Sequence, residues 1–182
     1  MLKNIFALCL CLILIAGALS AVQAAEKTPE QVVDACYAWY FKNSPVADGK
    51  GQDAGKNDFR KTFSQVKELF QPDLYSMLSI VFAKVNAMKS WKDNDMDLID
   101  AQPFNPTQVL LKKYAIGNAE IKGVKATVPV TLTLERGKKV IRIVELTKKD
   151  GVWRISDFFW PDQKGSGFST ELKEMLKKKK LI

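Results

Sequence analysis

The spacing of apolar residues along the chain changes after Thr107, from a helical period to a strand period. Before this point apolar residues recur every three or four positions, and this pattern predicts helices over 29–42, 59–70 and 72–85. Two polar stretches, the first also rich in glycine, predict long loops at 43–57 and 89–102.

The first predicted helix carries the strongest local signal for its start. Thr28 can cap it, Pro29 suits its first position, and Gln31 can complete a capping box. One apolar face consists of Val33, Cys36, Tyr37 and Tyr40. We therefore expect this helix to be largely covered by the rest of the protein.

Beyond Thr107 apolar and polar residues alternate, and turn signals separate the alternating stretches. Glycine-containing turns divide the region into predicted strands at 108–121, 124–135, 139–147 and 152–160. The second strand contains Pro129, which cannot donate a ladder hydrogen bond, so we expect that strand to lie at an edge or to be bulged there. A final helix is predicted from Phe168 to Lys180.

Helices followed by strands are typical of an α+β domain. We expect a single domain over 25–182, in which N-terminal helices pack in a curved antiparallel sheet of four strands. A C-terminal helix follows the sheet.

Residues 1–24 have the features of a cleavable secretory signal. Lys3 supplies the positive start, 5–19 is an apolar run broken only by small residues, and Val22-Gln23-Ala24 suits a cleavage site. We predict cleavage after Ala24 and a periplasmic or secreted location. No second apolar run is present, so we expect no transmembrane segment after cleavage.

Composition narrows the chemistry that the domain can perform. The chain has no histidine, which removes the commonest catalytic base and metal ligand. Cys9 and Cys11 leave with the signal, so Cys36 is expected to be a lone, buried thiol. Loss of Lys3 leaves 27 basic and 20 acidic residues, a net charge of +7. The basic residues are spread among the acidic ones, which does not favour a nucleic acid as partner.

Three short motifs occur in a distinctive order. They are Tyr37-Ala38-Trp39-Tyr40 in the first helix, Asp100-Ala101-Gln102-Pro103-Phe104 before the sheet, and Val152-Trp153-Arg154-Ile155-Ser156-Asp157 in the last strand. In this order they resemble a bacterial envelope family, domain of unknown function 3828, which looks like a branch of the nuclear-transport-factor-2-like superfamily. The resemblance covers roughly 30–180.

This resemblance implies a cone, in which a bent antiparallel sheet wraps around the helices and often leaves an apolar pocket at its mouth. The superfamily includes isomerases, dehydratases, binding modules and assembly domains, so the fold alone indicates no function. The resemblance to this family also implies no catalytic residues. The chain departs from the family pattern at Gln102, where an acidic residue is expected before the Pro-Phe pair.

The predicted contact surface is the mouth of this cone. The residues expected to contact a ligand or partner are Tyr37, Trp39, Tyr40, Arg154, Asp157, Phe158 and Trp160. The groups eligible for catalysis by a buried acid or phenol are Tyr37, Tyr40, Glu145 and Asp157. No acid is paired with an obvious base, so no catalytic residue is assigned. Asp157 can instead pair with Arg154, Arg142 or a backbone donor.

Asp93, Asp95 and Asp97 alternate in an acidic segment and form a weak calcium candidate. A calcium-hand loop needs glycine at its sixth position and glutamate at its twelfth, where this chain has Leu98 and Phe104. We therefore assign no metal and no cofactor. The lysines at 177–180 are expected to form a solvated tail rather than a membrane contact.

These observations favour an exported, non-enzymatic binding or protein-interaction domain. Its expected partner is another envelope protein or a small apolar ligand. Two alternatives stay open: a small hydrolase or isomerase that uses a buried Asp or Tyr in the cone, and an exported immunity or inhibitor protein.

Overall fold

The computed structural model describes residues 26–44, 58–88, 97–98, 103–105, 109–161 and 167–182. Within these ranges the protein is α+β, with four α-helices, one 3-10 segment and an open antiparallel sheet of five strands. The expected fold class and antiparallel sheet are therefore confirmed. The predicted signal at 1–24 lies outside the described residues, as does most of the two predicted loops, 45–57 of the first (43–57) and 89–96 and 99–102 of the second (89–102).

Helix α2 (Pro29–Asn43) begins as the sequence predicts. The amide of Gln31 donates to the Thr28 hydroxyl (3.3 Å), and the amide of Thr28 donates to the Gln31 side chain (2.9 Å). This capping box satisfies two N–H groups that have no partner within the helix.

The next helical stretch is less regular than its periodicity suggests. It consists of a short α3 (Phe59–Thr62) and a 3-10 segment η1 (Phe63–Leu69), with a kink at Val66. Its apolar side chains are nevertheless buried, because Phe59, Phe63 and Val66 all face the core. The longer helix α4 (Pro72–Ala87) then begins at its proline, as expected.

The sheet contains one strand more than the four predicted. The first predicted strand is divided into β1 (Leu111–Ile116) and β2 (Glu120–Lys122), both of which pair with β3 (Lys125–Leu134). The remaining strands are β4 (Lys139–Lys149) and β5 (Val152–Phe159). The strand order is β1-β3-β4-β5, so β5 forms one edge of the sheet.

Pro129 lies in a central strand, so the expectation of an edge strand is wrong. β3 pairs with β4 on one side, without a bulge at Pro129, and with β1 and β2 on the other. The carbonyl of Pro129 accepts a hydrogen bond from the amide of Gly117 (2.8 Å), which lies between β1 and β2. In an antiparallel sheet the backbone N and O atoms of one residue point toward the same neighbouring strand. The nitrogen of Pro129, which carries no hydrogen, therefore faces the break between β1 and β2 rather than β4.

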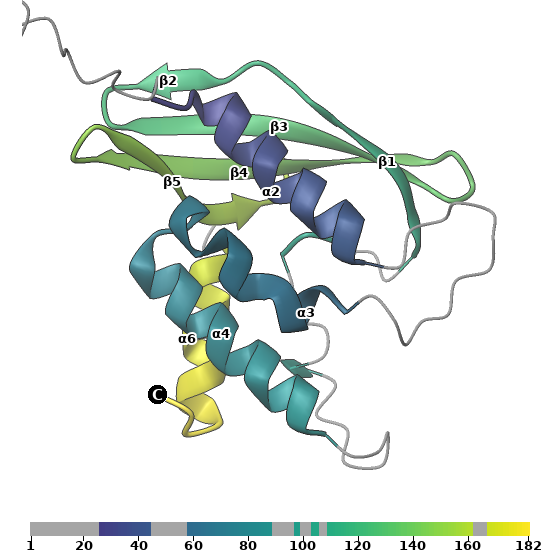
Figure 1. The fold of residues 1–182 in the computed structure, drawn as a ribbon, viewed down its shortest axis with the longest axis vertical. Coiled ribbons are helices and arrows are strands. Elements are labelled where there is room, and N and C mark those ends of the chain that lie inside the picture. Colours follow the sequence, from purple (N-terminus) through teal and green to yellow (C-terminus); the bar gives the residue numbers. More distant parts are fainter. Residues whose placement is uncertain (1–25, 45–57, 89–96, 99–102, 106–108, 162–166) are drawn as a thin grey trace, which may run out of the picture.

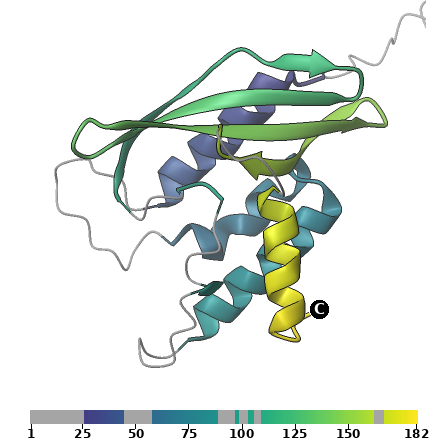
Figure 2. The same cartoon turned by 180° about the vertical axis from the view of Figure 1, so that it is seen from behind.

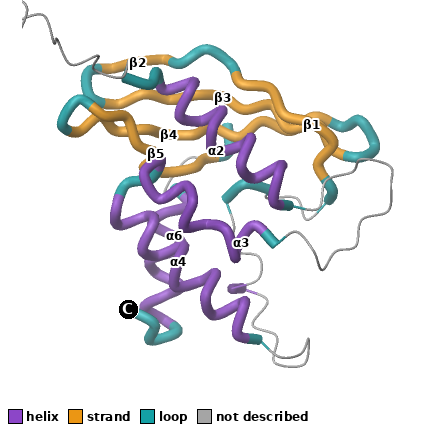
Figure 3. The backbone as a smooth tube through the Cα atoms, viewed as in Figure 1, coloured by secondary structure: helices purple, strands orange, loops and turns teal. Residues whose placement is uncertain are grey.

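Helix α2 covers one face of the sheet (Figures 1 and 3). The inward residues of the two central strands are Ala126, Val128, Val130, Leu132, Arg142, Val144 and Leu146. Helices α4 and α6 (Phe168–Lys178) lie beyond the β5 edge and contact each other. Figure 2 shows the opposite face of the sheet, in front of α2, with no described helix across it. Among the described elements, helices therefore cover only one face of the sheet.

None of the helices in the described ranges combines the length and the apolar character that crossing a bilayer requires.

Candidate functional site

The aromatic residues predicted on α2 lie in the core of the protein. Tyr37, Trp39 and Tyr40 are 0%, 7% and 5% exposed. Trp39 and Tyr40 each pack against the ring of Phe104, with ring centroids 5.6 and 5.1 Å apart. Burial raises the pKa of both Tyr37 and Tyr40. These side chains therefore form an aromatic interior, and their predicted contact role remains a prediction.

The four predicted residues on and after β5 fall into different surroundings. Phe158 is buried, and the Trp160 side chain is half-buried beside it. Arg154 pairs with Thr147 of β4 and is half-buried on the other face of the strand. Asp157 is only 8% exposed. The structure thus brings Phe158 and Trp160 together but directs Arg154 elsewhere.

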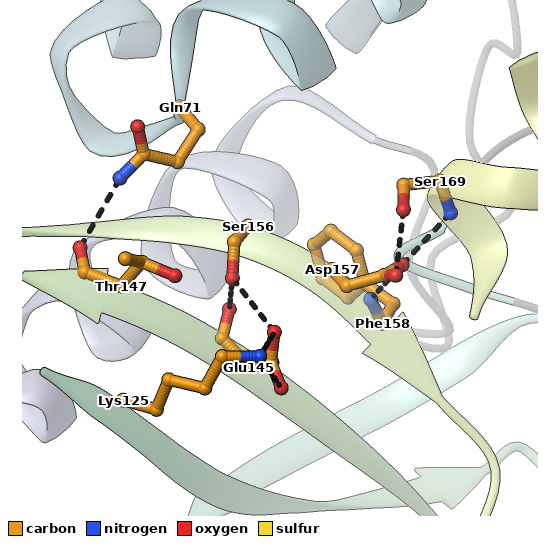
Figure 4. A network of polar contacts seen from close by, with 8 residues as sticks. All are labelled: Gln71, Lys125, Glu145, Thr147, Ser156, Asp157, Phe158 and Ser169. Atoms are coloured by element: carbon orange, nitrogen blue, oxygen red, sulfur yellow. Dashed lines mark hydrogen bonds and ion pairs between the residues drawn. The ribbon is translucent and has the colours of Figure 1, made fainter. Parts of the chain in front are cut away.

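Asp157, which is 12 residues before Ser169 in the sequence, caps the C-terminal helix. Its Oδ1 accepts hydrogen bonds from the amides of Phe158 and Ser169 (both 2.8 Å), and its Oδ2 accepts one from the Ser169 hydroxyl (2.6 Å) (Figure 4). Ser169 is in the first turn of α6, where free N–H groups and the helix dipole favour a carboxylate. A Cβ atom at Gly167 would collide with the Asp157 carboxylate, so this close approach needs glycine. The expectation of a backbone donor is confirmed, and the role is structural.

Arg142 is a buried cation that the sequence suggests only as a possible partner of Asp157. It is 3% exposed on the covered face of the sheet, and its guanidinium carbon lies 5.0 Å from the ring centre of Trp160 and 5.9 Å from that of Phe158. Burial lowers its pKa, while Tyr37 and the carboxylates of Asp157 and Glu171 act in the opposite direction. The signal was present in the sequence, because Arg142 occupies an inward position of an alternating strand.

The buried polar groups around α2 are incompletely satisfied. The Nε atom of Arg142 and the hydroxyl of Tyr37 have no hydrogen-bond partner among the described residues. The ion pairs found within the described part of the chain do not include Arg142. Such groups are rare in folded proteins and each calls for a physical explanation.

A polar groove of about 640 Å³ opens beside β5, at the N-terminal ends of α4 and α6. Its lining residues are Gln71, Pro72, Asp73, Leu74, Met77, Lys149, Ser156, Ser169, Thr170 and Lys173. A second hollow of about 290 Å³ adjoins it and adds Lys67, Glu68, Phe70, Tyr75, Asp150 and Arg154. The two share Gln71, Pro72 and Lys149 and form one continuous surface, which we call the β5 groove.

Gln71 and Ser156 shape the floor of the β5 groove. The amide of Gln71 donates to the carbonyl of Ile155 (2.8 Å), and its side chain donates to the carbonyl of Thr147 (3.2 Å). Ser156 is the extra residue of a β-bulge, and its hydroxyl donates to the Glu145 carboxylate (3.2 Å) (Figure 4). Bulges are common next to functional sites because they redirect side chains. The sequence alternation gave no sign of this bulge.

The calcium candidate is described only at Asp97. This side chain is exposed and forms an ion pair with Lys179 of the lysine tail (3.2 Å). Asp93 and Asp95 lie outside the described residues. Among those that are described, no group of three possible metal-binding side chains comes together.

No family model matches the sequence, and a search of curated proteins found no similar chain. The resemblance to the domain of unknown function 3828 family therefore stays a prediction.

Proposed function

We propose that the protein is an exported, non-enzymatic binding protein of the periplasm or the extracellular space, and that the β5 groove is its contact surface. The observation that carries this proposal is the groove itself, about 640 Å³ in volume and lined by convergent hydroxyl, amide and ammonium groups. We further propose that the fold is a cone of the nuclear-transport-factor-2-like kind, as the resemblance implies.

Binding is favoured over catalysis by the surroundings of the eligible side chains. Asp157 is occupied as the cap of α6, and Glu145 pairs with Lys125 and accepts from Ser156. Burial raises the pKa of the two tyrosines, so neither phenol is a good base near neutral pH. A catalytic proton transfer would need a group that is both accessible and near its pKa.

The lining of the β5 groove favours an extended, acidic segment of another envelope protein as its occupant. Lys67, Lys149, Arg154 and Lys173 supply four cations, against the three acids Glu68, Asp73 and Asp150. The carbonyl of Ile155 already accepts a main-chain bond from Gln71, so an occupant would be held at this point by the side chains that line the groove rather than by backbone pairing with β5. The net charge of +7 after loss of the signal also attracts an acidic partner.

Export is tested by cell fractionation and N-terminal sequencing of the full chain expressed from its own start codon. We expect a processed form beginning at Ala25 outside the cytoplasm. An unprocessed protein in the cytoplasmic fraction would contradict the proposed location.

The groove is tested by photo-crosslinking from Thr170, which lies in the β5 groove, with Lys113 on β1 as the control position. We expect a discrete adduct from Thr170 only, mapping to an acidic segment of the captured protein. The purified partner should then bind Lys149→Glu/Lys173→Glu at least about tenfold more weakly than wild type. Lys112→Glu/Lys113→Glu on β1 should leave its affinity unchanged. Equal affinity for both double variants would rule out the groove as the contact surface.

A further inference from the structure

We propose that Arg142 and Tyr37 form a buried binding site for a small organic carboxylate, between α2 and the covered face of the sheet. This site is separate from the β5 groove and does not depend on the role proposed for it.

Arg142 is placed in the interior by the register of the sheet. It lies opposite Val130 on β3, and the next inward residues of β4 are Val144 and Leu146, both fully buried. A guanidinium cannot be neutralised by deprotonation at ordinary pH, so its burial requires a counter-charge. Arg142 is therefore held where an apolar side chain would be expected from the strand pattern.

The described residues supply this cation with aromatic rings and with the negative charges of Asp157 and Glu171, which act to raise its pKa, but with no hydrogen-bond acceptor at its Nε. Trp160 and Phe158 lie at 5.0 and 5.9 Å from the guanidinium carbon, which gives partial cation-π compensation. Tyr37 is fully buried and its hydroxyl is also unsatisfied. The positive charge of Arg142 acts to lower the pKa of Tyr37 against the larger effect of burial, so the two groups are close in electrostatic terms.

The chemistry of the two groups defines the missing ligand. A guanidinium offers only donors, arranged as a planar fork, and a neutral tyrosine hydroxyl can donate one further hydrogen bond. A carboxylate has two coplanar acceptor oxygens that match the fork, and it brings a single negative charge. A phosphate dianion would leave excess charge in the same apolar surroundings.

Apolar neighbours favour a carboxylate with an apolar body. The ring of Tyr114 lies 5.7 Å from that of Tyr37, and Phe158 contacts both Phe104 and Phe168. Trp160 is only half-buried while Arg142 is almost wholly buried, so the indole lies nearer the surface than the cation it stacks on. Its fluorescence should therefore respond when the site is filled.

The test uses the purified mature chain with three probes, acetate, phenylacetate and octanoate, and with 2-phenylethanol as the uncharged match of phenylacetate. Calorimetry and tryptophan fluorescence should detect phenylacetate or octanoate at millimolar concentrations, with acetate weaker and 2-phenylethanol at least about tenfold weaker. Absence of binding by all three carboxylates would overturn the proposal, as would equal binding of the alcohol.

Variants locate the site. Arg142→Met should weaken binding of phenylacetate at least about tenfold, and Arg142→Lys, which keeps the charge but not the fork, should weaken it less. Tyr37→Phe should weaken it several-fold, while Trp160→Phe should remove the fluorescence change but not the calorimetric signal. Arg136→Met, in the exposed turn between β3 and β4, is the matched control and should bind as wild type does. Unchanged affinity in Arg142→Met would place the ligand elsewhere and refute the assignment.

Acids of the chain itself are the competing counter-charges. Asp157 and Glu171 already act on Arg142 electrostatically, and Asp162 follows Trp160 closely in the sequence. Asp162→Asn should leave both the melting temperature and phenylacetate affinity unchanged. A double-mutant cycle that couples Asp162 to Arg142 in stability would show an internal ion pair and would overturn the ligand site.

Discussion

Asp157 and Arg142 are both buried charged side chains on neighbouring strands, but the fold treats them in opposite ways. The carboxylate of Asp157 accepts three hydrogen bonds and fixes the start of α6. The guanidinium of Arg142 has two aromatic rings beside it and an unsatisfied Nε. Asp157 is hydrogen-bonded by the surrounding fold, whereas Arg142 is balanced only electrostatically, by Asp157 and Glu171.

The difference separates a structural charge from a candidate binding charge. Burying an ion is costly unless it is paired and hydrogen-bonded, so a fully bonded ion needs no further explanation. The hydroxyls of Tyr37 and Ser44 are also buried without a partner among the described residues, and of these two Tyr37 is the group that Arg142 acts on electrostatically. The comparison predicts that removing the charge of Asp157 lowers the stability of the protein, whereas removing the charge of Arg142 does not.

The largest effect is expected when Asp157 is removed. Asp157→Ala leaves buried donors without an acceptor, and we expect the free energy of unfolding to fall by about 3 kcal/mol in urea denaturation followed by circular dichroism. Asp157→Asn keeps one acceptor oxygen and should cost about 1 kcal/mol. The exposed Asp73 is the control, and its replacement by alanine should have a small effect. If Asp157→Ala were as mild as the control, the cap would not be a structural charge.

A smaller loss is expected from Gly167→Ala. The new methyl group would meet the Asp157 carboxylate and lie 2.7 Å from Cε1 of Phe159, so the cap must shift. We expect destabilisation of about 2 kcal/mol by the same denaturation measurement. Gly137→Ala is the control, because Gly137 has a positive φ but no atom near its Cβ position. Its loss of stability measures backbone strain alone, without a steric collision. The cap would be shown to be loosely packed if Gly167→Ala proved the milder of the two.

A local cap should matter less than the long-range one. Thr28→Ala removes one half of the capping box of α2, which lies at the surface, and should cost about 1 kcal/mol in thermal or urea unfolding. Lys27→Ala, next to it and exposed, should change stability little. A loss larger than that of Asp157→Ala would reverse the proposed order of the two caps.

No loss of stability, or a gain, is expected for Arg142→Met without added ligand. Replacing a buried cation that lacks a hydrogen-bond partner at its Nε by an apolar side chain of similar length should leave stability unchanged or raise it by up to about 2 kcal/mol. The measurement is the urea midpoint of the purified protein. A loss comparable to that of Asp157→Ala would mean that Arg142 has a structural partner, and the contrast between the two charges would disappear.

The helices and strands could be predicted where residues close together in the sequence determine the backbone conformation. The capping box at Thr28, the alternation in β3 and the turn glycines each act through near neighbours in the sequence, and the elements follow them. The kinked η1 and the division of β1 from β2 could not be predicted in this way. Both depend on contacts with distant parts of the chain, such as the pairing of Gly117 with Pro129.

The candidate sites were less predictable than the fold. Trp39 and Tyr40 were expected at the mouth of the predicted cone. The sequence pattern of an aromatic residue in a helix is the same whether the side chain packs in the core or contacts a partner. Their burial depends on Phe59 and Phe104, which are remote in sequence. The β5 groove combines α4, α6 and the end of β4, so no local pattern marks it. Arg142 alone had a readable signal, a charge at an inward strand position.

Pro129 also restricts how the sheet can be assembled. If β1 shifted its register on β3 by two residues, one of its residues would take the place opposite Pro129 that Gly117 now occupies. The carbonyl of that residue would lack a hydrogen bond, because Pro129 has no N–H to donate. Any side chain there would also strike the proline ring, since even a Cβ at Gly117 would be 2.7 Å from its Cγ. The single imino acid in the middle of the sheet thereby penalises mispaired arrangements that the alternating pattern alone would tolerate.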